Sequence, residues 1–252
     1  MKVLVAGHKG FLGKKIYSVL SKCRGVDLFP KPEENPDYLN YIFPCKFDAV
    51  INCAGYTDVD GCEKNKKLAF ESNVLLVKKI LGQCTSKTHF IHISSDYVIR
   101  PINYYAQTKK EAEELLFEFP KIPSIALRVS GLYGFNDSND RKTFALWVTE
   151  QKGNAITVFN SAAINVTLID DIAEAIEKII KEKITGIKNC VGKDCLTKYE
   201  FAKKIYSVFG FDENKVIPST ELPSSWIAER PERIELKSDF HALNAEDGLK
   251  KM

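Results

Sequence analysis

Apolar and polar positions alternate along the chain in blocks that predict strands and helices in turn. Short apolar runs are typical of parallel strands buried on both faces. Between these runs, apolar residues recur at helical spacing, as they do at Leu68, Val74 and Leu75. The strands that we expect cover residues 3–5, 26–29, 47–55, 88–95, 124–130, 155–159 and 186–191. This alternation predicts an α/β fold, a Rossmann-type doubly wound parallel sheet with a small C-terminal substrate-binding elaboration.

The first strand runs into a turn marked by Gly7, Gly10 and Gly13. In dinucleotide-binding folds the first such glycine permits a tight turn and the second lets a phosphate approach the backbone. The third allows close packing of helix on strand. The N-terminus of the following helix offers N–H groups that suit a pyrophosphate. Since the pattern follows a buried strand and precedes a helix, it favours dinucleotide binding over a bare strand–turn–helix.

The end of the second expected strand bears on which dinucleotide is bound. An acidic residue there typically holds the ribose 2′-hydroxyl of NAD. Asp27 lies early for that role, and the strand end offers Lys31 instead. Lys31, together with His8 and Lys9, could accommodate a 2′-phosphate, or all three could be solvated surface charges. The sequence therefore favours NADP and leaves NAD open.

Candidate reaction chemistry follows the fourth expected strand. Ser95, Asp96 and Tyr97 stand at its carboxyl end, where open α/β sheets bind their ligands. Tyr105 and Lys109 come four residues apart in the next expected helix, hence on one helical face. A nearby cation favours the anion of a phenol, whose pKa is otherwise near ~10. The alternative is a chance Tyr/Lys pair at a helix start, which the position after a glycine turn and a serine-bearing strand disfavours.

Several other polar residues have a structural interpretation. His89 and His92 are three apart in a strand and so face opposite ways, which predicts core or edge histidines rather than metal ligands. Asp170 and Asp171 open an expected helix, and we interpret them as caps. A Thr-x-x-Glu pattern at Thr197 predicts a capping box.

Composition narrows the functional class. The chain has 252 residues, 44% of them hydrophobic and 27% charged, which fits one α/β domain. A net charge of +3 gives no argument for nucleic acid. No apolar run approaches the ~18 residues of a membrane span, and the N-terminus does not resemble a secretory signal. The 7 cysteines form no Cys-x-x-Cys pair. We therefore expect a cytoplasmic protein with reduced thiols, no metal, and no nucleic-acid or membrane partner.

Together these residues resemble the extended short-chain dehydrogenase/reductase superfamily, and within it the dTDP-4-dehydrorhamnose reductases. The similarity extends over nearly the whole chain. The motifs that carry it are Gly7-x-x-Gly10-x-x-Gly13, Asn52-Cys53-Ala54-Gly55, Thr57-x-Val59-Asp60-x-x-Glu63, Ser94-Ser95-Asp96-Tyr97-Val98, Tyr105-x-x-Thr108-Lys109, Arg128-Val129-Ser130-Gly131-Leu132-Tyr133-Gly134, Thr197-x-Tyr199-Glu200-Phe201-Ala202 and Arg230-Pro231.

The resemblance implies hydride transfer from NAD(P)H to the ketone of a nucleoside-diphosphate 4-keto-6-deoxysugar. It implies that Tyr105 donates the proton, that Lys109 binds the nicotinamide ribose and tunes Tyr105, and that Ser95 holds the substrate oxygen. The implied substrate contacts are Asp96, Tyr97 and Arg230, the last on the diphosphate. The implied cofactor contacts are Gly7, His8, Lys9, Gly10, Phe11, Leu12, Lys31, Cys53, Ala54, Gly55, Tyr105, Lys109 and Val129.

Two other functions stay open within the same resemblance. A sugar-nucleotide 4-epimerase shares the Ser/Tyr/Lys set. A non-catalytic NADP-binding regulatory subunit, similar to the β subunit of methionine adenosyltransferase, would fit the short connection of nine residues between Ser95 and Tyr105. A dehydratase lacks support, because Asp-Tyr rather than Asp-Glu follows Ser95. We expect a single domain over 1–252, with substrate-binding segments mainly at 131–168 and 192–245, and leave a homodimer open.

Overall fold

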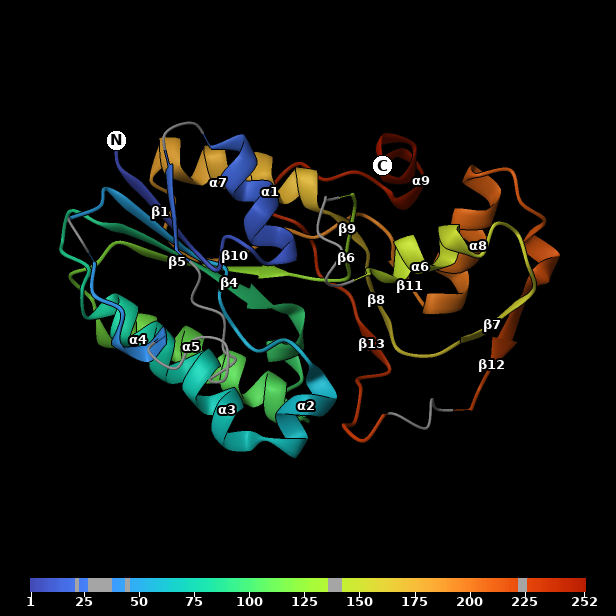
Figure 1. Cartoon of the computed structure of the whole chain (residues 1–252), viewed down its shortest axis with the longest axis horizontal. Helices are drawn as coiled ribbons and strands as arrows, with labels where there is room; N and C mark the ends of the chain where they lie inside the picture. Colours follow the sequence, from blue (N-terminus) through green and yellow to red (C-terminus); the bar gives the residue numbers. More distant parts are fainter. Residues whose placement is uncertain (21–22, 27–37, 44–45, 136–141, 222–225) are drawn as a thin grey trace.

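A parallel sheet of six strands forms the centre of the molecule (Figure 1), in the order β10-β5-β4-β3-β1-β2. The computed structural model describes residues 1–20, 23–26, 38–43, 46–135, 142–221 and 226–252. The sheet strands are β1 (Val3–Ala6), β2 (Cys23–Val26), β3 (Ala49–Asn52), β4 (His89–Ser95), β5 (Ser124–Val129) and β10 (Gly186–Asn189). This arrangement confirms the predicted fold class.

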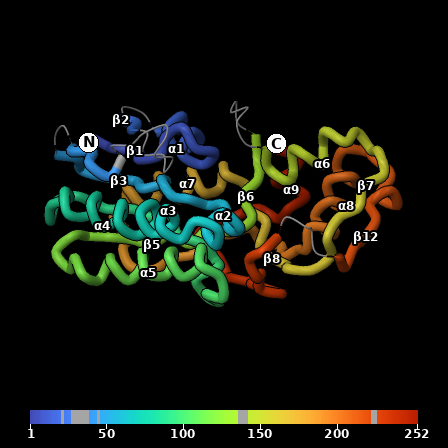
Figure 2. The backbone as a smooth tube through the Cα atoms, turned by 60° about the horizontal axis from the view of Figure 1, so that its bottom comes forward, coloured from blue at the N-terminus to red at the C-terminus, as the bar shows by residue number. Residues whose placement is uncertain are grey.

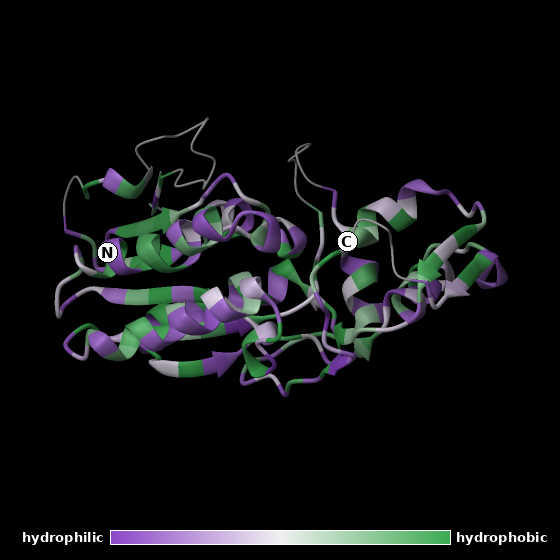
Figure 3. Ribbon diagram, turned by 90° about the horizontal axis from the view of Figure 1, so that it is seen from below, coloured by the Kyte–Doolittle hydropathy of each residue, from purple (hydrophilic) through white to green (hydrophobic). Residues whose placement is uncertain are grey.

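Helices cover both faces of this sheet, as a doubly wound fold requires (Figure 1). On one face α1 (Phe11–Val19) packs against α7 (Ile169–Glu182), and their aliphatic side chains share a core with the strands. The core on the other face takes side chains from five elements: η1 (Tyr38–Asn40), α3 (Lys66–Phe70), the π-helical turn η2 (Glu71–Leu75), α4 (Leu76–Leu81) and α5 (Tyr104–Glu118). Two further elements, α2 (Val59–Lys64) and η3 (Asp96–Ile99), pack against α5. In Figure 3 the helices carry alternating hydrophilic and hydrophobic stretches, as expected when one side of each helix packs on the sheet.

A smaller lobe with its own hydrophobic core lies to one side of the sheet (Figures 1 and 2). Its short strands are β6 (Leu132–Tyr133), β7 (Ile156–Phe159), β8 (Ala163–Asn165), β9 (Thr167–Leu168), β11 (Cys195–Leu196), β12 (Val216–Ser219) and β13 (Arg233–Ile234). Its helices are α6 (Phe144–Glu150), α8 (Lys198–Val208), η4 (Glu213–Lys215) and α9 (Ala245–Lys251). Because β6 follows β5 almost directly and β13 contacts η3, this lobe meets the sheet where β4 and β5 end.

The structure confirms one of the predictions about individual elements and corrects two. The capping box at Thr197 is confirmed, with the Glu200 side chain accepting from the Thr197 N–H at 2.8 Å. The second strand was placed too late: it covers Cys23–Val26, which pairs in register with Val3–Ala6, and 27–29 lie outside the described residues. Asp170 and Asp171 do not cap α7, since Asp170 pairs with Lys15 and Asp171 accepts from the Leu243 N–H.

Candidate active site

The glycine turn brings the end of β1 against the turn that follows β3. Gly7 has a φ of +76°, and a Cβ there would stand 2.7 Å from the Ala54 nitrogen. A Cβ on Gly13 would overlap the Gly7 carbonyl oxygen. These two glycines are therefore required by the fold itself, independently of any ligand.

Gly10 stands apart from the other two glycines. It is exposed at the N-cap of α1, and an added Cβ would meet only the Gly7 carbonyl oxygen, at 3.3 Å. A glycine at this N-cap also provides no side chain that could cap the helix or fill the space in front of it. The turn is thus a cradle that a side chain would obstruct, which fits the predicted approach of a pyrophosphate.

Most of the other residues predicted to contact a cofactor lie around the same end of the sheet. Cys53, Ala54 and Gly55 follow β3, where the Cys53 N–H donates to the Ala6 carbonyl at 2.9 Å. Leu12 is buried in the sheet core, so only its backbone can face a ligand. Lys31 lies outside the described residues. The others are placed as follows: exposed Lys9, half-buried His8 and Phe11 beside the glycine turn, and buried Val129 at the end of β5.

Ser95 and Tyr105 meet at the carboxyl end of β4. Ser95 is the last residue of the strand, and Tyr105 lies in the first turn of α5, so that the two hydroxyl groups lie at the same strand end. Burial raises the pKa of Tyr105, and the nearby Ser95 hydroxyl offsets only part of that rise. Tyr97 closes one side, its ring 5.9 Å from that of Tyr105 in an edge-on arrangement. At neutral pH Tyr105 is consequently a phenol with a proton to give.

Lys109 lies one turn further along α5, with its side chain buried against β4. Its Nζ donates to the Ile93 carbonyl oxygen at 2.6 Å and lies 3.4 Å from His92 Nε2. Burial lowers the pKa of Lys109 to about 8, although the Glu113 carboxylate one turn further on opposes this. The predicted pair of Tyr105 and Lys109 on one helical face is thus brought to the strand end that carries Ser95.

Asp96 is held between two serine hydroxyls. Ser95 Oγ donates to its Oδ1 at 3.0 Å and Ser130 Oγ donates to its Oδ2 at 2.6 Å. The side chain is 3% exposed, and burial raises its pKa to about 6 despite both hydrogen bonds. Ser130 was not among the predicted site residues. Its sequence signal was its place in the motif that starts at Arg128. In the structure Ser130 directly follows Val129, which lies opposite Ser95 in the pairing of β5 with β4.

A buried ion pair anchors the site helix to the sheet. Glu113 on α5 accepts from Arg128 Nη2 on β5 at 2.7 Å and from Ser94 Oγ on β4 at 2.5 Å. Since Glu113 is one turn from Lys109, this three-way contact sets the height of α5 above the strand ends. The motif residues Ser94 and Arg128 thus support the site from beneath.

Arg230 reaches across from the small lobe and binds α2. Its guanidinium contacts both carboxylate oxygens of Asp60, at 2.6 and 2.9 Å, and lies 4.5 Å over the Trp226 ring. The pairing draws two motif residues together, the aspartate of Thr57-x-Val59-Asp60 and the arginine of Arg230-Pro231. A contact of Arg230 with a substrate diphosphate stays a prediction.

The RmlD substrate binding domain family matches residues 1–247. The chain belongs to this family. A probable low-salt glycan biosynthesis reductase of Haloferax volcanii, Agl14, is 28% identical over 204 residues, which are 74% of this chain and 68% of the relative. Methionine adenosyltransferase 2 subunit beta of Danio rerio is 23% identical over 94% of this chain and 82% of that protein.

Solved structures agree with this RmlD family assignment. A dTDP-4-dehydrorhamnose reductase of Clostridium acetobutylicum superposes with a TM-score of 0.84 at 26% identity, covering 100% of this chain and 98% of that one. The fold is also shared with a dTDP-4-dehydrorhamnose reductase of Bacillus anthracis in complex with NADP. That match has a TM-score of 0.82 at 24% identity, with 99% and 97% of the chains covered. The predicted resemblance is confirmed.

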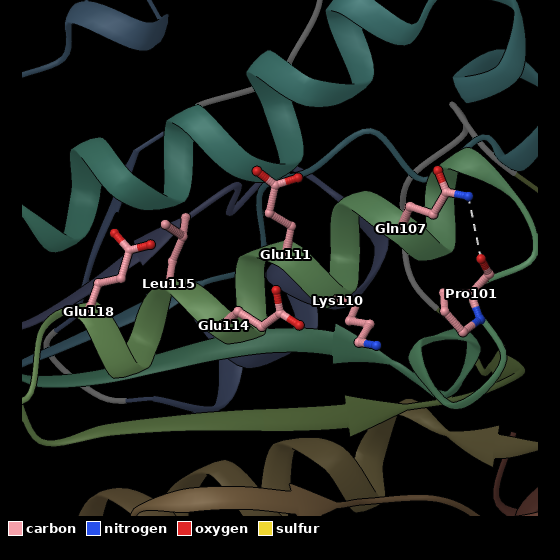
Figure 4. Close-up of a pocket in the computed structure, with 7 residues that line it drawn as sticks. All are labelled: Pro101, Gln107, Lys110, Glu111, Glu114, Leu115 and Glu118. Atoms are coloured by element: carbon pink, nitrogen blue, oxygen red, sulfur yellow. Dashed lines mark hydrogen bonds between the residues drawn. The ribbon is translucent and has the colours of Figure 1, made fainter.

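One cavity of this RmlD family member lies away from the site, on the outer face of α5 (Figure 4). Its volume is about 570 Å³, and Gln107 Nε2 donates to the Pro101 carbonyl at its rim, at 3.5 Å. The lining residues are Pro101, Gln107, Lys110, Glu111, Glu114, Leu115 and Glu118. Three glutamates against one lysine make this lining unsuited to an anionic nucleotide sugar.

The residues that the structure describes contain no group of three His, Cys, Asp or Glu side chains that could hold a metal ion. None of the helices found there is both long and apolar enough to cross a membrane. The cysteines described are free thiols: Cys23, Cys53, Cys62, Cys84, Cys190 and Cys195.

Proposed function

We propose that this protein is an NADPH-dependent reductase of a nucleoside-diphosphate 4-keto-6-deoxysugar. The observation that carries the proposal is the meeting of Ser95, Tyr105 and Lys109 at the carboxyl end of β4. A protonated phenol beside a serine hydroxyl suits protonation of a ketone oxygen. The names of the Haloferax and Clostridium proteins, both reductases, support the same reaction class.

The glycine turn supports a dinucleotide as the hydride source. Gly10 leaves room for a pyrophosphate at the N-terminus of α1, and the turn after β3 offers small residues beside it. The NADP complex of the Bacillus anthracis protein favours NADP over NAD. When bound, NADPH would supply the hydride, and the protein would align and polarise the ketone.

The residues of the site would then divide the work on the substrate oxygen. Tyr105 would give its phenolic proton to that oxygen while the hydride adds to the carbon, which completes the alcohol. Ser95 would orient the ketone by turning its hydroxyl proton from Asp96 to the ketone oxygen. Lys109 would return a proton toward Tyr105 and bind the nicotinamide ribose. The segments 131–168 and 192–245 would hold the sugar nucleotide against this group.

A direct assay tests this proposal. Purified protein is mixed with NADPH and, in separate reactions, with a panel of nucleoside-diphosphate 4-keto-6-deoxysugars, and cofactor oxidation is followed by absorbance. Mass spectrometry of the product should show a gain of two hydrogens. Oxidation without that product, or with every ketone at the same slow rate, would contradict a sugar-nucleotide reductase.

A regulatory subunit is the second candidate. It is favoured by the similarity to methionine adenosyltransferase 2 subunit beta over 94% of this chain. In this case the site would bind NADP and leave it unreacted. Tight NADPH binding by calorimetry, combined with no oxidation by any ketosugar of the panel, would select this function over the reductase.

A further inference from the structure

His92 connects the turn after β3 to Lys109 through a buried row of polar groups. The Ala54 N–H donates to Asn52 Oδ1 at 3.2 Å, and Asn52 Nδ2 lies 3.2 Å from His92 Nδ1. On the far side of the ring, His92 Nε2 lies 3.4 Å from Lys109 Nζ. Asn52 and His92 are both 0% exposed, so water does not replace these partners.

The donors in this row fix the tautomer of His92. Because Asn52 Oδ1 accepts from the Ala54 backbone, its amide NH₂ must face His92 Nδ1. Nδ1 therefore accepts, and a neutral imidazole that accepts at Nδ1 carries its proton on Nε2. The opposite tautomer would set two N–H donors against each other between Asn52 and His92.

An Nε2–H pointed at Lys109 discriminates between the two forms of that amine. A neutral amine has a lone pair that can accept this N–H, whereas an ammonium group has only donors. The Ile93 carbonyl satisfies one Lys109 proton in either form. We propose that His92 is a positioning residue for Lys109, because Asn52 aims its Nε2–H at the amine and so stabilises the neutral form.

The other groups around Lys109 do not prevent the His92 Nε2–H from stabilising its neutral amine. Burial lowers the pKa of His92 well below its usual range, so the ring is neutral, and burial also lowers that of Lys109. Glu113 opposes the shift of Lys109, but its carboxylate is shared with Arg128 and Ser94. The titratable groups that act on Lys109 are Glu113 on its own helix, Cys53 after β3, Cys62 on α2 and His92 on β4.

The role of His92 in proton supply rests on the proposed function, whereas its tautomer and the titration of Lys109 can be measured without it. In a reductase, Tyr105 must recover a proton after each turnover, and an amine that loses and regains its proton near neutrality can supply it. An ordinary lysine, with a pKa near ~10.4, would stay charged throughout. His92 and Asn52 would thus set the proton supply of the site without touching substrate.

The tautomer can be read directly from the full-length protein without cofactor or substrate. The chain has 4 histidines, so ¹⁵N-labelled imidazoles give few signals, and His92→Gln assigns the one of interest. We expect His92 to be the neutral Nε2–H tautomer at neutral pH. An Nδ1–H tautomer, or a charged ring, would overturn the proposal whether or not the protein is a reductase.

The effect on Lys109 is measured by titrating ¹³Cε-labelled lysines, with Lys109→Met assigning the signal. In His92→Gln the amide oxygen can accept from Asn52, which turns the amide NH₂ toward Nζ and keeps a donor there, so the Lys109 titration should stay near that of the parent. Asn52→Asp would draw the imidazole proton to Nδ1 and replace the donor by an acceptor at Lys109, so the titration should move up by roughly one pH unit, a tenfold gain in proton affinity.

The matched control is His89→Gln, the same substitution on the same strand. His89 contacts the Ile184 carbonyl at 2.9 Å, on the side of the sheet away from Lys109. The Lys109 titration should be unchanged in this variant. A Lys109 signal that titrates at the parent pH in Asn52→Asp would overturn the proposal, even if ketosugar reduction is lost.

Discussion

Arg230 and Asp60 are bound to each other across the two lobes by a two-point ion pair, 170 residues apart in sequence. Asp60 also accepts from the backbone N–H groups of Ile227 and Ala228, at 2.8 and 3.0 Å. One carboxylate on α2 thus holds the whole turn that leads into β13. Because Arg230 lowers the pKa of Asp60, this tie is complete at neutral pH.

The first prediction separates a structural from a substrate role of Arg230. Arg230→Ala should lower the free energy of unfolding by roughly 2–3 kcal/mol, since it leaves a charged acceptor in a mostly buried place. The stability difference should be full above the ordinary aspartate pKa near ~4 and shrink in more acidic solution, where Asp60 becomes protonated. Urea denaturation at several pH values measures both.

Asp60→Asn is the matched variant for that experiment, since it weakens the same tie without removing the guanidinium. If Arg230 also contacts the substrate diphosphate, Arg230→Ala should raise the KM for the sugar nucleotide well beyond the rise in Asp60→Asn. Equal KM values in the two variants would leave Arg230 with the structural role alone.

The second prediction concerns the glycine turn. Gly10→Val should still fold, because Gly10 is exposed and a small shift relieves the single tight contact of its Cβ, 3.3 Å from the Gly7 carbonyl oxygen. It should weaken NADPH binding about tenfold or more by filling the cradle. Gly13→Ala should instead destabilise the fold, since its Cβ overlaps the Gly7 carbonyl. Cofactor fluorescence titration and thermal melting report the two effects separately. Unchanged NADPH affinity in folded Gly10→Val would refute the assignment of this turn.

The part of the candidate site that could be predicted from the sequence depends on short intervals between residues. The glycine turn and the Tyr105/Lys109 pair are set by intervals of three and four residues, which a helix or a tight turn converts directly into proximity. Ser95 was found because a strand end is itself a position of known meaning in an open sheet. These predictions needed no knowledge of register.

Partners that come from distant segments could not be predicted in this way. Ser130 reaches Asp96 because β4 and β5 pair with Ser95 opposite Val129, and that register is set by the packing of both strands. The spacing of His89 and His92 in one strand predicted core or edge histidines, and the burial of both confirms this. The contacts of His92 with Asn52 and Lys109 could not be predicted in the same way, because these partners lie 40 and 17 residues away in sequence. The Asp60–Arg230 pair joins the two lobes across 170 residues of sequence.

The third prediction is a pH dependence of stability that originates in Asp96. Its pKa in the folded protein, about 6, is above the ordinary value, so the folded state holds this proton more tightly. Asp96 therefore favours folding most below pH ~4, and this contribution falls by about 3 kcal/mol as pH rises to ~6. Asp96→Asn should abolish that part of the dependence.

The measurement is the difference in unfolding free energy between parent and Asp96→Asn across the range from pH ~4 to ~7. Subtraction cancels the titration of carboxylates elsewhere, provided that they are far from Asp96. Ser130→Ala is the companion variant: it removes one hydrogen bond to the carboxylate, so the pKa of Asp96 should rise further. A pH-independent difference for Asp96→Asn would show that the carboxylate does not titrate in this range.

The last prediction addresses the proton donor. Tyr105→Phe keeps the ring against Tyr97 but removes the transferable proton, so folding and NADPH binding should survive. General acid catalysis typically contributes ~10²–10⁴-fold, and turnover should fall by about that factor.

Ser95→Ala should reduce turnover less if Ser95 only orients the ketone. Lys109→Met should lower turnover and also weaken NADPH binding, because its amine is assigned both tasks. Steady-state rates and binding titrations on the three variants give the pattern. A Tyr105→Phe enzyme as fast as the parent would remove Tyr105 from the mechanism.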